Sequence, residues 1–240
     1  MRSPLIVLTV FLAAGAGAAH AQTFALSQTL ENPSKNTGDV FGLSVASFGP
    51  YVLVGAPLAD VAGVDAGAAY LYRLTGGLLN LEQTFVPTGA AAGSEFGFSV
   101  AGVPNGAGGY NAVVGAWLDD TGAHDTGAAY LFDAQTGVLI SKLTNPTPAA
   151  LDYFGVAVAA MGNDFLVGAV NDTAATGLPH AGAVYRFDGL TGNLVRTYGN
   201  PQARYSPAAD DKFGQPLAPY AANIQAGAYD GRSGASSTTR

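Results

Sequence analysis

The 240-residue chain is 48% hydrophobic and only 11% charged, with a formal net charge of −7. This balance predicts a sizeable folded core and excludes intrinsic disorder as the default state. The pI near 4.6, with no Lys/Arg cluster, excludes nucleic acid as an expected partner. Cysteine is absent, which excludes disulfides, thiolate metal sites and a cysteine nucleophile.

The N-terminus has the pattern of a secretory signal peptide. Arg2 precedes an apolar run from Leu5 to Ala14, and Ala19-His20-Ala21 then supplies a small-x-small cleavage motif. The apolar run is too short to span a membrane well, and no later segment looks transmembrane. We therefore predict that residues 1–21 are removed and that the mature chain is exported, either secreted, at the cell surface or in the periplasm.

The remaining chain repeats one unit, and residues 22–228 are predicted to form a single repeat domain. Each copy opens with Phe-Gly and then carries Gly-Ala, and the first three copies continue with Gly-Ala-x-Tyr. We number the units one to four by their opening pairs, which are Phe41-Gly42, Phe96-Gly97, Phe154-Gly155 and Phe213-Gly214. A period of this length is typical of repeat architectures in which no unit buries its apolar face alone.

Four short strands are expected in each whole unit. The first follows Phe-Gly, the second ends at Gly-Ala, the third holds an aromatic alternation such as Tyr130-Leu131-Phe132, and the fourth covers ranges such as Leu78–Phe85. β-branched and aromatic residues bounded by Gly, Asn, Asp and Pro are the strand signal, and no helical periodicity competes with it. The predicted class is therefore all-β, a propeller of four-stranded blades.

Both ends of the repeat are expected to be incomplete. Residues 22–33 match the end of a unit, so we expect them to supply the strand that completes the last blade. Unit four contains Pro216 and Pro219, which argue against an inner strand, and its polar remainder, residues 229–240, is predicted to be disordered. The chain then holds about three whole blades plus partial ones. It is either truncated, completed by self-association, or closed by a distorted fourth blade.

Acidic residues gather between the second and third strands. In unit two, Asp119, Asp120 and Asp125 are close enough in sequence to approach one Ca²⁺. The alternative is turn chemistry, which uses the same residues. Trp117 and His124 lie in the same loop and are the predicted ligand contacts, because the other units vary there.

Two further sets of residues are expected to be structural. An acid recurs just before each Phe-Gly, at Asp39, Glu95, Asp152 and Asp211, and is expected to bond backbone amides. Tyr70, Tyr130 and Tyr185 occupy equivalent strand positions and are expected in the core.

Phe41-Gly42 followed by Gly55-Ala56-Pro57 resembles the FG-GAP repeat of integrin α subunits and of many exported bacterial proteins. The resemblance covers residues 24 to about 229. It implies a β-propeller that binds an extracellular protein or glycan, or mediates adhesion, through loops at one face. Family members often hold calcium between the first two strands, but the links at residues 48–50, 103–109 and 162–164 lack the spaced carboxylates that this cation needs.

The turns Asp133–Gly137 and Asp188–Gly192 are similar to the D-x-x-T-G turn of quinoprotein repeats. Ser141 and Arg196 occupy the positions where those enzymes carry a packing tryptophan. We therefore expect a non-catalytic binding or adhesion module without a firmly implied cofactor. The alternative is a fragment of a larger propeller protein, a quinoprotein-like or hydrolytic enzyme whose active site is not in this chain.

Overall fold

The computed structural model describes residues 27–87, 91–173, 177–201, 212–215, 217–220, 223–226 and 238–239. Within these ranges every regular element is a strand, so the predicted all-β class is confirmed. No helix in the described part of the chain is long and apolar enough to cross a membrane. The predicted signal peptide lies outside the described residues.

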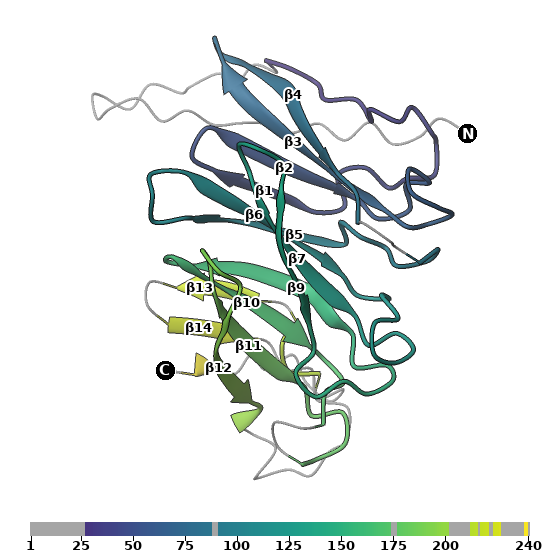
Figure 1. Cartoon of the computed structure of the whole chain (residues 1–240), viewed down its shortest axis with the longest axis vertical. Coiled ribbons are helices and arrows are strands. Elements are labelled where there is room, and N and C mark those ends of the chain that lie inside the picture. The colour runs from purple at the N-terminus through teal and green to yellow at the C-terminus, as the bar shows by residue number, and fades with distance from the viewer. Residues whose placement is uncertain are drawn as a thin grey trace, which may run out of the picture.

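Each of the first three units forms one four-stranded antiparallel sheet in simple chain order, as the sequence predicts (Figure 1). The strands of unit one are β1 (Val45–Phe48), β2 (Tyr51–Ala56), β3 (Ala68–Thr75) and β4 (Leu78–Phe85). Those of unit two are β5 (Ser99–Pro104), β6 (Tyr110–Ala116), β7 (Ala128–Asp133) and β8 (Leu139–Thr144). Those of unit three are β9 (Phe154–Met161), β10 (Asp164–Ala169), β11 (Ala183–Asp188) and β12 (Leu194–Gly199).

Burial explains the sequence pattern of the second strands. All six residues of β2 are buried, and the same holds for most of β6 and β10. A strand covered on both faces needs a continuous apolar run rather than an alternation. This explains why Tyr51-Val52-Leu53-Val54 contains no polar residue between the apolar ones. The fourth strands lie at the outside of each sheet, and β12 is largely exposed.

The sheets stack side by side like successive blades of a propeller. Their first strands follow one another, with β5 beside β1, β9 beside β5 and β13 (Leu217–Tyr220) beside β9. One apolar cluster fills the space between units one and two and another that between units two and three. Phe96 and Phe154 belong to these clusters; Phe96 packs edge-on against Tyr130 and Phe132, and Phe154 packs edge-on against Phe187.

The Phe-Gly pair joins each unit to the sheet before it. Phe96 forms a bridge with Gly67, and Phe154 forms the same bridge with Gly127. A Cβ atom at Gly67 would lie 2.1 Å from the carbonyl oxygen of Phe96. The position therefore requires glycine, both for this approach and for its φ of +84°.

A second close approach uses the glycine of Gly-Ala. A Cβ atom at Gly55 would meet the carbonyl oxygen of Gly97 at 1.9 Å, and one at Gly115 would meet that of Gly155 at 2.1 Å. The hydroxyls of Ser44 and Ser99 donate to these same carbonyls, at 2.7 and 2.8 Å. The recurring glycines are thus the contact points between sheets.

The incomplete units differ from expectation. Unit four forms a three-stranded sheet of β13, β14 (Asn223–Ala226) and β15 (Thr238–Thr239). Pro219 lies inside β13, which the prolines were predicted to prevent; β13 bonds only to β14, and an edge strand tolerates a residue without an N–H. Thr238–Thr239, in the stretch predicted to be disordered, pairs with β14, while residues 229–237 and Arg240 lie outside the described part.

The N-terminal segment does not complete the last blade in the part that the structure describes. Residues 27–33 form no strand and lie against unit one instead. The side-chain amide of Gln28 donates to the Leu79 carbonyl at 2.9 Å and accepts from its N–H at 2.8 Å. Residues 22–26 lie outside the described range.

The substitution Gly115→Ala should destabilise the protein by about 3 kcal/mol, because the added methyl group overlaps the Gly155 backbone, which cannot move without separating two sheets. Gly38→Ala is the matched control, since nothing lies within 4 Å of a Cβ atom there. Urea unfolding measures both changes. Equal midpoints for the two variants would show that the glycine contact is dispensable.

Candidate functional site

The loops between second and third strands lie at one end of each blade, together with the residues that precede the next Phe-Gly. Backbone bonds tie the two segments, with the N–H of Glu95 donating to Asp65 at 3.1 Å and that of Tyr153 to Asp125 at 3.2 Å. We call this end of the blades the loop face. All residues that the sequence singled out for binding lie on it.

The three equivalent tyrosines are buried, as predicted, and the hydroxyls of Tyr130 and Tyr185 bond to aspartates beneath the loop face. Tyr130 donates to Asp119 at 2.7 Å, and Tyr185 donates to Asp172 at 2.5 Å. Unit one has Ala59 at the position of these aspartates. The tyrosines therefore anchor the loops as well as filling the core.

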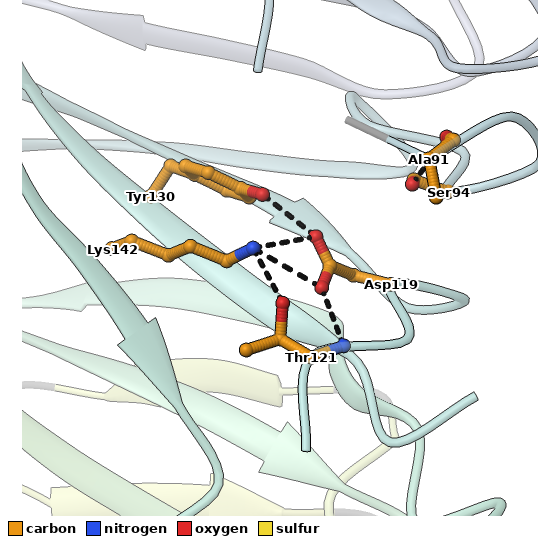
Figure 2. A network of polar contacts seen from close by, with 6 residues as sticks. All are labelled: Ala91, Ser94, Asp119, Thr121, Tyr130 and Lys142. Carbon is orange, nitrogen blue, oxygen red and sulfur yellow. Dashed lines mark hydrogen bonds and ion pairs between the residues drawn. The ribbon is translucent and has the colours of Figure 1, made fainter. Parts of the chain in front are cut away.

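Asp119 is the centre of a saturated polar network (Figure 2). Besides Tyr130, its carboxylate accepts from the Lys142 ammonium at 3.0 and 3.2 Å and from the Thr121 N–H at 2.9 Å. The ammonium also donates to the Thr121 hydroxyl at 2.6 Å. Burial alone would raise the pKa of Asp119, but hydrogen bonds from Thr121, Tyr130 and Lys142 outweigh it and hold the pKa below its ordinary value.

This network removes Asp119 from the predicted metal set. The side chain is 4% exposed, and a lysine ammonium already occupies the place where a cation would neutralise it. The sequence did not reveal the partner, because Lys142 lies on β8, well beyond the loop. Strand pairing brings it there by placing Lys142 opposite Tyr130, where units one and three have Thr84 and Thr197.

In unit three, the aspartate that accepts from the tyrosine, Asp172, has a second acid, Asp152, as a neighbour instead of a lysine. Asn145 donates through its side-chain amide both to Asp152, at 2.8 Å, and to Asp172, at 2.9 Å. Both carboxylates are almost fully buried. Burial raises the pKa of Asp152 to about 6, and the nearby carboxylate of Asp172 adds to the rise, while bonds from the Ala149 N–H and from Asn145 oppose it.

The acids before Phe-Gly are not one set. Asp152 accepts from the Ala149 N–H at 2.7 Å, which is the predicted backbone role. Asp39 instead accepts from the side chains of Asn32 and Ser34. Glu95 stands one position later, in the left-handed region with φ of 52°, so its equivalents are Val40, Tyr153 and Lys212 rather than the aspartates. The equivalent of Asp39 in unit two is Ser94, and Asp211 lies outside the described residues.

The other two predicted metal residues, Asp120 and Asp125, lie close to His124, which was predicted as a ligand contact. One ligand atom each of Asp120, His124 and Asp125 lies within 4.8 Å of the other two. Asp120 also accepts the Asp125 N–H at 2.8 Å, and Asp60 accepts the Asp65 N–H at 2.9 Å in unit one. The aspartates therefore make the same turn in both loops, which is the alternative that the sequence left open. His124, in place of Val64, is what unit two adds.

Trp117 lies in an aromatic cluster that the sequence did not predict. Its ring centroid is 5.0 Å from those of both Phe98 and Tyr153, and its indole N–H donates to Glu95 at 2.7 Å. All four side chains are partly exposed. The sequence does contain a signal for this cluster: Glu95 and Tyr153 each directly precede a Phe-Gly pair. The residue at that position lies on the loop face, and both residues contact Trp117 there.

The aromatic cluster and the Asp120 group are neighbours, because Tyr153 bonds to Asp125 through the backbone. We call the combined set the unit-two surface; it comprises Glu95, Phe98, Trp117, Asp120, His124, Asp125 and Tyr153. Its aromatic faces can stack against a ligand, and its carboxylates can accept hydrogen bonds or hold a cation. The equivalents of Phe98 and Trp117 are Leu43 and Pro57 in unit one and Val156 and Val170 in unit three, so among the three whole units only unit two has this aromatic pair.

The substitution Lys142→Thr should cost about 2 kcal/mol at neutral pH, because it leaves a buried carboxylate without its charged partner, although Lys142 is partly solvated. Since the folded pKa of Asp119 lies below its unfolded value, this stabilisation exists above about pH 4 and is lost as the pH falls through the folded pKa. Lys35→Gln, which removes the charge of an exposed lysine without adding a β-branched side chain, is the control. A Lys142→Thr penalty in urea unfolding that does not shrink in acid would contradict the assignment.

The substitution Asp152→Asn should have the opposite pH dependence. Because the folded pKa of Asp152 is raised to about 6, the wild type loses stability as the pH rises from about 4 through 6. The amide mimics the protonated acid, so the variant should gain about 1–2 kcal/mol relative to wild type over that window. Urea midpoints at the two ends of the window test this, and a constant difference between the proteins would refute it.

A family of known proteins matches the chain once in each of its three whole units. The family model described as FG-GAP repeat matches residues 27–72, 79–132 and 138–187. No curated protein sequence matches the chain. Among solved structures, the chain is similar to the computationally designed Ika8 protein, with 18% identity over 80% of this chain and 43% of that one and a TM-score of 0.45. It is also similar to a europium-containing methanol dehydrogenase, with 15% identity over 63% of this chain and 23% of that one and a TM-score of 0.40.

The chain thus spans less than half the length of these two structures. The family matches, in contrast, coincide with the three whole sheets and cover more than half of the sequence. This protein belongs to the FG-GAP repeat family.

Proposed function

We propose that the protein is an exported, non-catalytic binding module that holds an extracellular protein or glycan on the unit-two surface. The observation that carries this proposal is the partly exposed cluster of Phe98, Trp117 and Tyr153 beside the Glu95 carboxylate. Exposed aromatic side chains with polar tips are typical of recognition surfaces, because they offer a large contact area at low conformational cost.

Comparison between units supports a binding role for this cluster. The sheets stack in the same way at each junction, whether the equivalent side chains are aromatic or aliphatic. The three rings are therefore not required by the architecture. The signal-peptide pattern and the FG-GAP family, whose members are typically extracellular, support export to the cell surface or beyond.

Trp117 is the single tryptophan of the chain, so its fluorescence reports on this surface alone. Titration with soluble glycans and matrix proteins should shift the emission when the ligand is present, and Tyr153→Ala should weaken the response at least tenfold, because it removes one contact ring. Leu190→Ala, at an exposed turn of unit three, should leave binding unchanged. The proposal fails if Leu190→Ala weakens binding as much as Tyr153→Ala does. It also fails if no ligand shifts the emission of the wild type.

A second proposal concerns a divalent cation held by Asp120, His124 and Asp125. The proximity of their ligand atoms favours this proposal. Because Asp120 and His124 are exposed and Asp125 is partly exposed, we expect weak affinity for Ca²⁺. The imidazole would also suit a transition metal such as Zn²⁺.

Unit one offers a matched control for this cation. His124→Val gives the loop the residue of unit one and should abolish any rise in melting temperature on adding Ca²⁺ or Zn²⁺. Val64→His gives unit one the same donor set and should add a second binding event, detectable by calorimetry. A rise in melting temperature that survives His124→Val would refute this assignment.

A further inference from the structure

A short turn precedes the Phe-Gly pair of unit three, and its last residue is Tyr153 of the unit-two surface. We call residues 149–153 the junction turn. Toward unit two, the N–H of Leu151 donates to the His124 carbonyl at 2.9 Å. Toward unit three, the side-chain amide of Asn171 donates to the Leu151 carbonyl at 3.0 Å. The junction turn is therefore fixed between the loops of two neighbouring blades.

The backbone of the junction turn is strained at two positions. Leu151 and Tyr153 have φ of 67° and 57°, a left-handed conformation that is unfavourable for residues with a Cβ atom. The turn before unit two has the same backbone and ends at Glu95, with φ of 52°. At the position of Leu151, however, it has Gly93, which takes its φ of 82° without a steric cost. The junction turn thus carries more strain, and such strain persists only where surrounding contacts hold it.

Asp152 supplies such contacts. Its carboxylate accepts from the Ala149 N–H at 2.7 Å, which closes the turn, and from the Asn145 amide at 2.8 Å, which ties the turn to the end of β8. In the turn before unit two, the equivalent residue is Ser94, whose hydroxyl donates to the Ala91 carbonyl at 2.7 Å (Figure 2). An ionised carboxylate makes a stronger hydrogen bond than a neutral hydroxyl does. The stronger bond therefore belongs to the turn with more strain.

Both turns place their last residue against Trp117. Glu95 accepts from the indole N–H at 2.7 Å, and the centroids of the Tyr153 and Trp117 rings are 5.0 Å apart. The position of the Tyr153 ring depends on the backbone of the junction turn, because Tyr153 is the end of that turn. Asp152 is 3% exposed, so it acts on this surface through the turn and not by touching a ligand.

We infer that Asp152 is a positioning residue of the unit-two surface: by holding the junction turn in its left-handed conformation, it keeps Tyr153 against Trp117. The consequence for binding rests on the proposed function, since it concerns the ligand of the same surface. A ligand that meets two rings already in contact pays less to order them. The loss of Asp152 should therefore weaken binding although Asp152 lies outside the contact area.

Asp152→Ser tests the inference in the full chain without a ligand, because Trp117 is the single tryptophan. The emission should shift to longer wavelength and acrylamide should quench it more strongly, both toward the values of Tyr153→Ala, which removes the ring itself. Asp188→Ser is the matched control. Asp188 also accepts a backbone N–H, from Thr191 at 2.8 Å, but it lies at the end of β11 away from the loop face. A shift in Asp188→Ser as large as that in Asp152→Ser would overturn the inference.

The turn before unit two supplies a rescue. Leu151→Gly, added to Asp152→Ser, copies the Gly93-Ser94 pair into the junction turn and should restore the wild-type emission and quenching, because glycine removes the strain that Asp152 holds. Urea unfolding shows whether each variant is folded. If Asp152→Ser alone does not fold, recovery of the fold on adding Leu151→Gly supports the inference in the same way. A folded Asp152→Ser with wild-type spectra overturns it, and so does a double variant that shifts as far or also fails to fold.

Ligand binding gives a separate readout. For a glycan or matrix protein that shifts the wild-type emission, Asp152→Ser should weaken binding by less than Tyr153→Ala does, because the ring is still present, and the added Leu151→Gly should restore it. A ligand that binds Asp152→Ser as tightly as the wild type would overturn the inference. If no glycan or matrix protein binds the wild type, the proposed function fails, while the spectra of the ligand-free variants still decide whether Asp152 positions Tyr153.

Discussion

The structure depends on the approach of two backbones at the glycines beneath each Phe-Gly pair. Gly67 and Gly127 lie so close to the following phenylalanine that no side chain fits, and Gly55 and Gly115 lie equally close to the glycine that follows it. These contacts fix the distance between sheets, and the phenylalanine rings fill the space that this distance leaves. The serine hydroxyls at Ser44 and Ser99 satisfy the carbonyls that the approach buries, whereas Ala157 at the same position of unit three cannot donate.

Because the glycines define the stacking, the loop face is free to vary between units. The tyrosine hydroxyl under each loop has been satisfied in different ways, by Asp119 with Lys142 in unit two and by Asp172 with Asn145 in unit three. Each solution balances buried charge differently, which is why Asp119 and Asp152 have pKa values shifted in opposite directions. The chemistry of the face thus differs between neighbouring blades while their backbones remain alike.

Much of the fold could be predicted from the sequence, because strand pattern and glycine spacing are local signals. The four strands of each whole unit lie where the repeat places them. Pro219 misled the prediction because a sequence does not reveal which strands are edges. The candidate site could be predicted less completely. Asp119 and Trp117 were identified as polar and aromatic loop residues, but their partners Lys142 and Tyr153 come from strands and junctions that only the register brings near. Sequence proximity grouped Asp119 with Asp120, and burial separated them.

The residue before each Phe-Gly has a backbone that favours glycine and yet is never glycine. Val40, Glu95, Tyr153 and Lys212 all have φ between 49° and 57°, a conformation that costs other residues about 1–2 kcal/mol. A β-branched residue such as Val40 is especially strained there. Four chemically unlike side chains, one aliphatic, one acidic, one aromatic and one basic, are thus presented at the same pitch along the stack. The backbone keeps this conformation whichever of the four side chains it carries, so the side chain at this position differs between units without altering how the blades fit together.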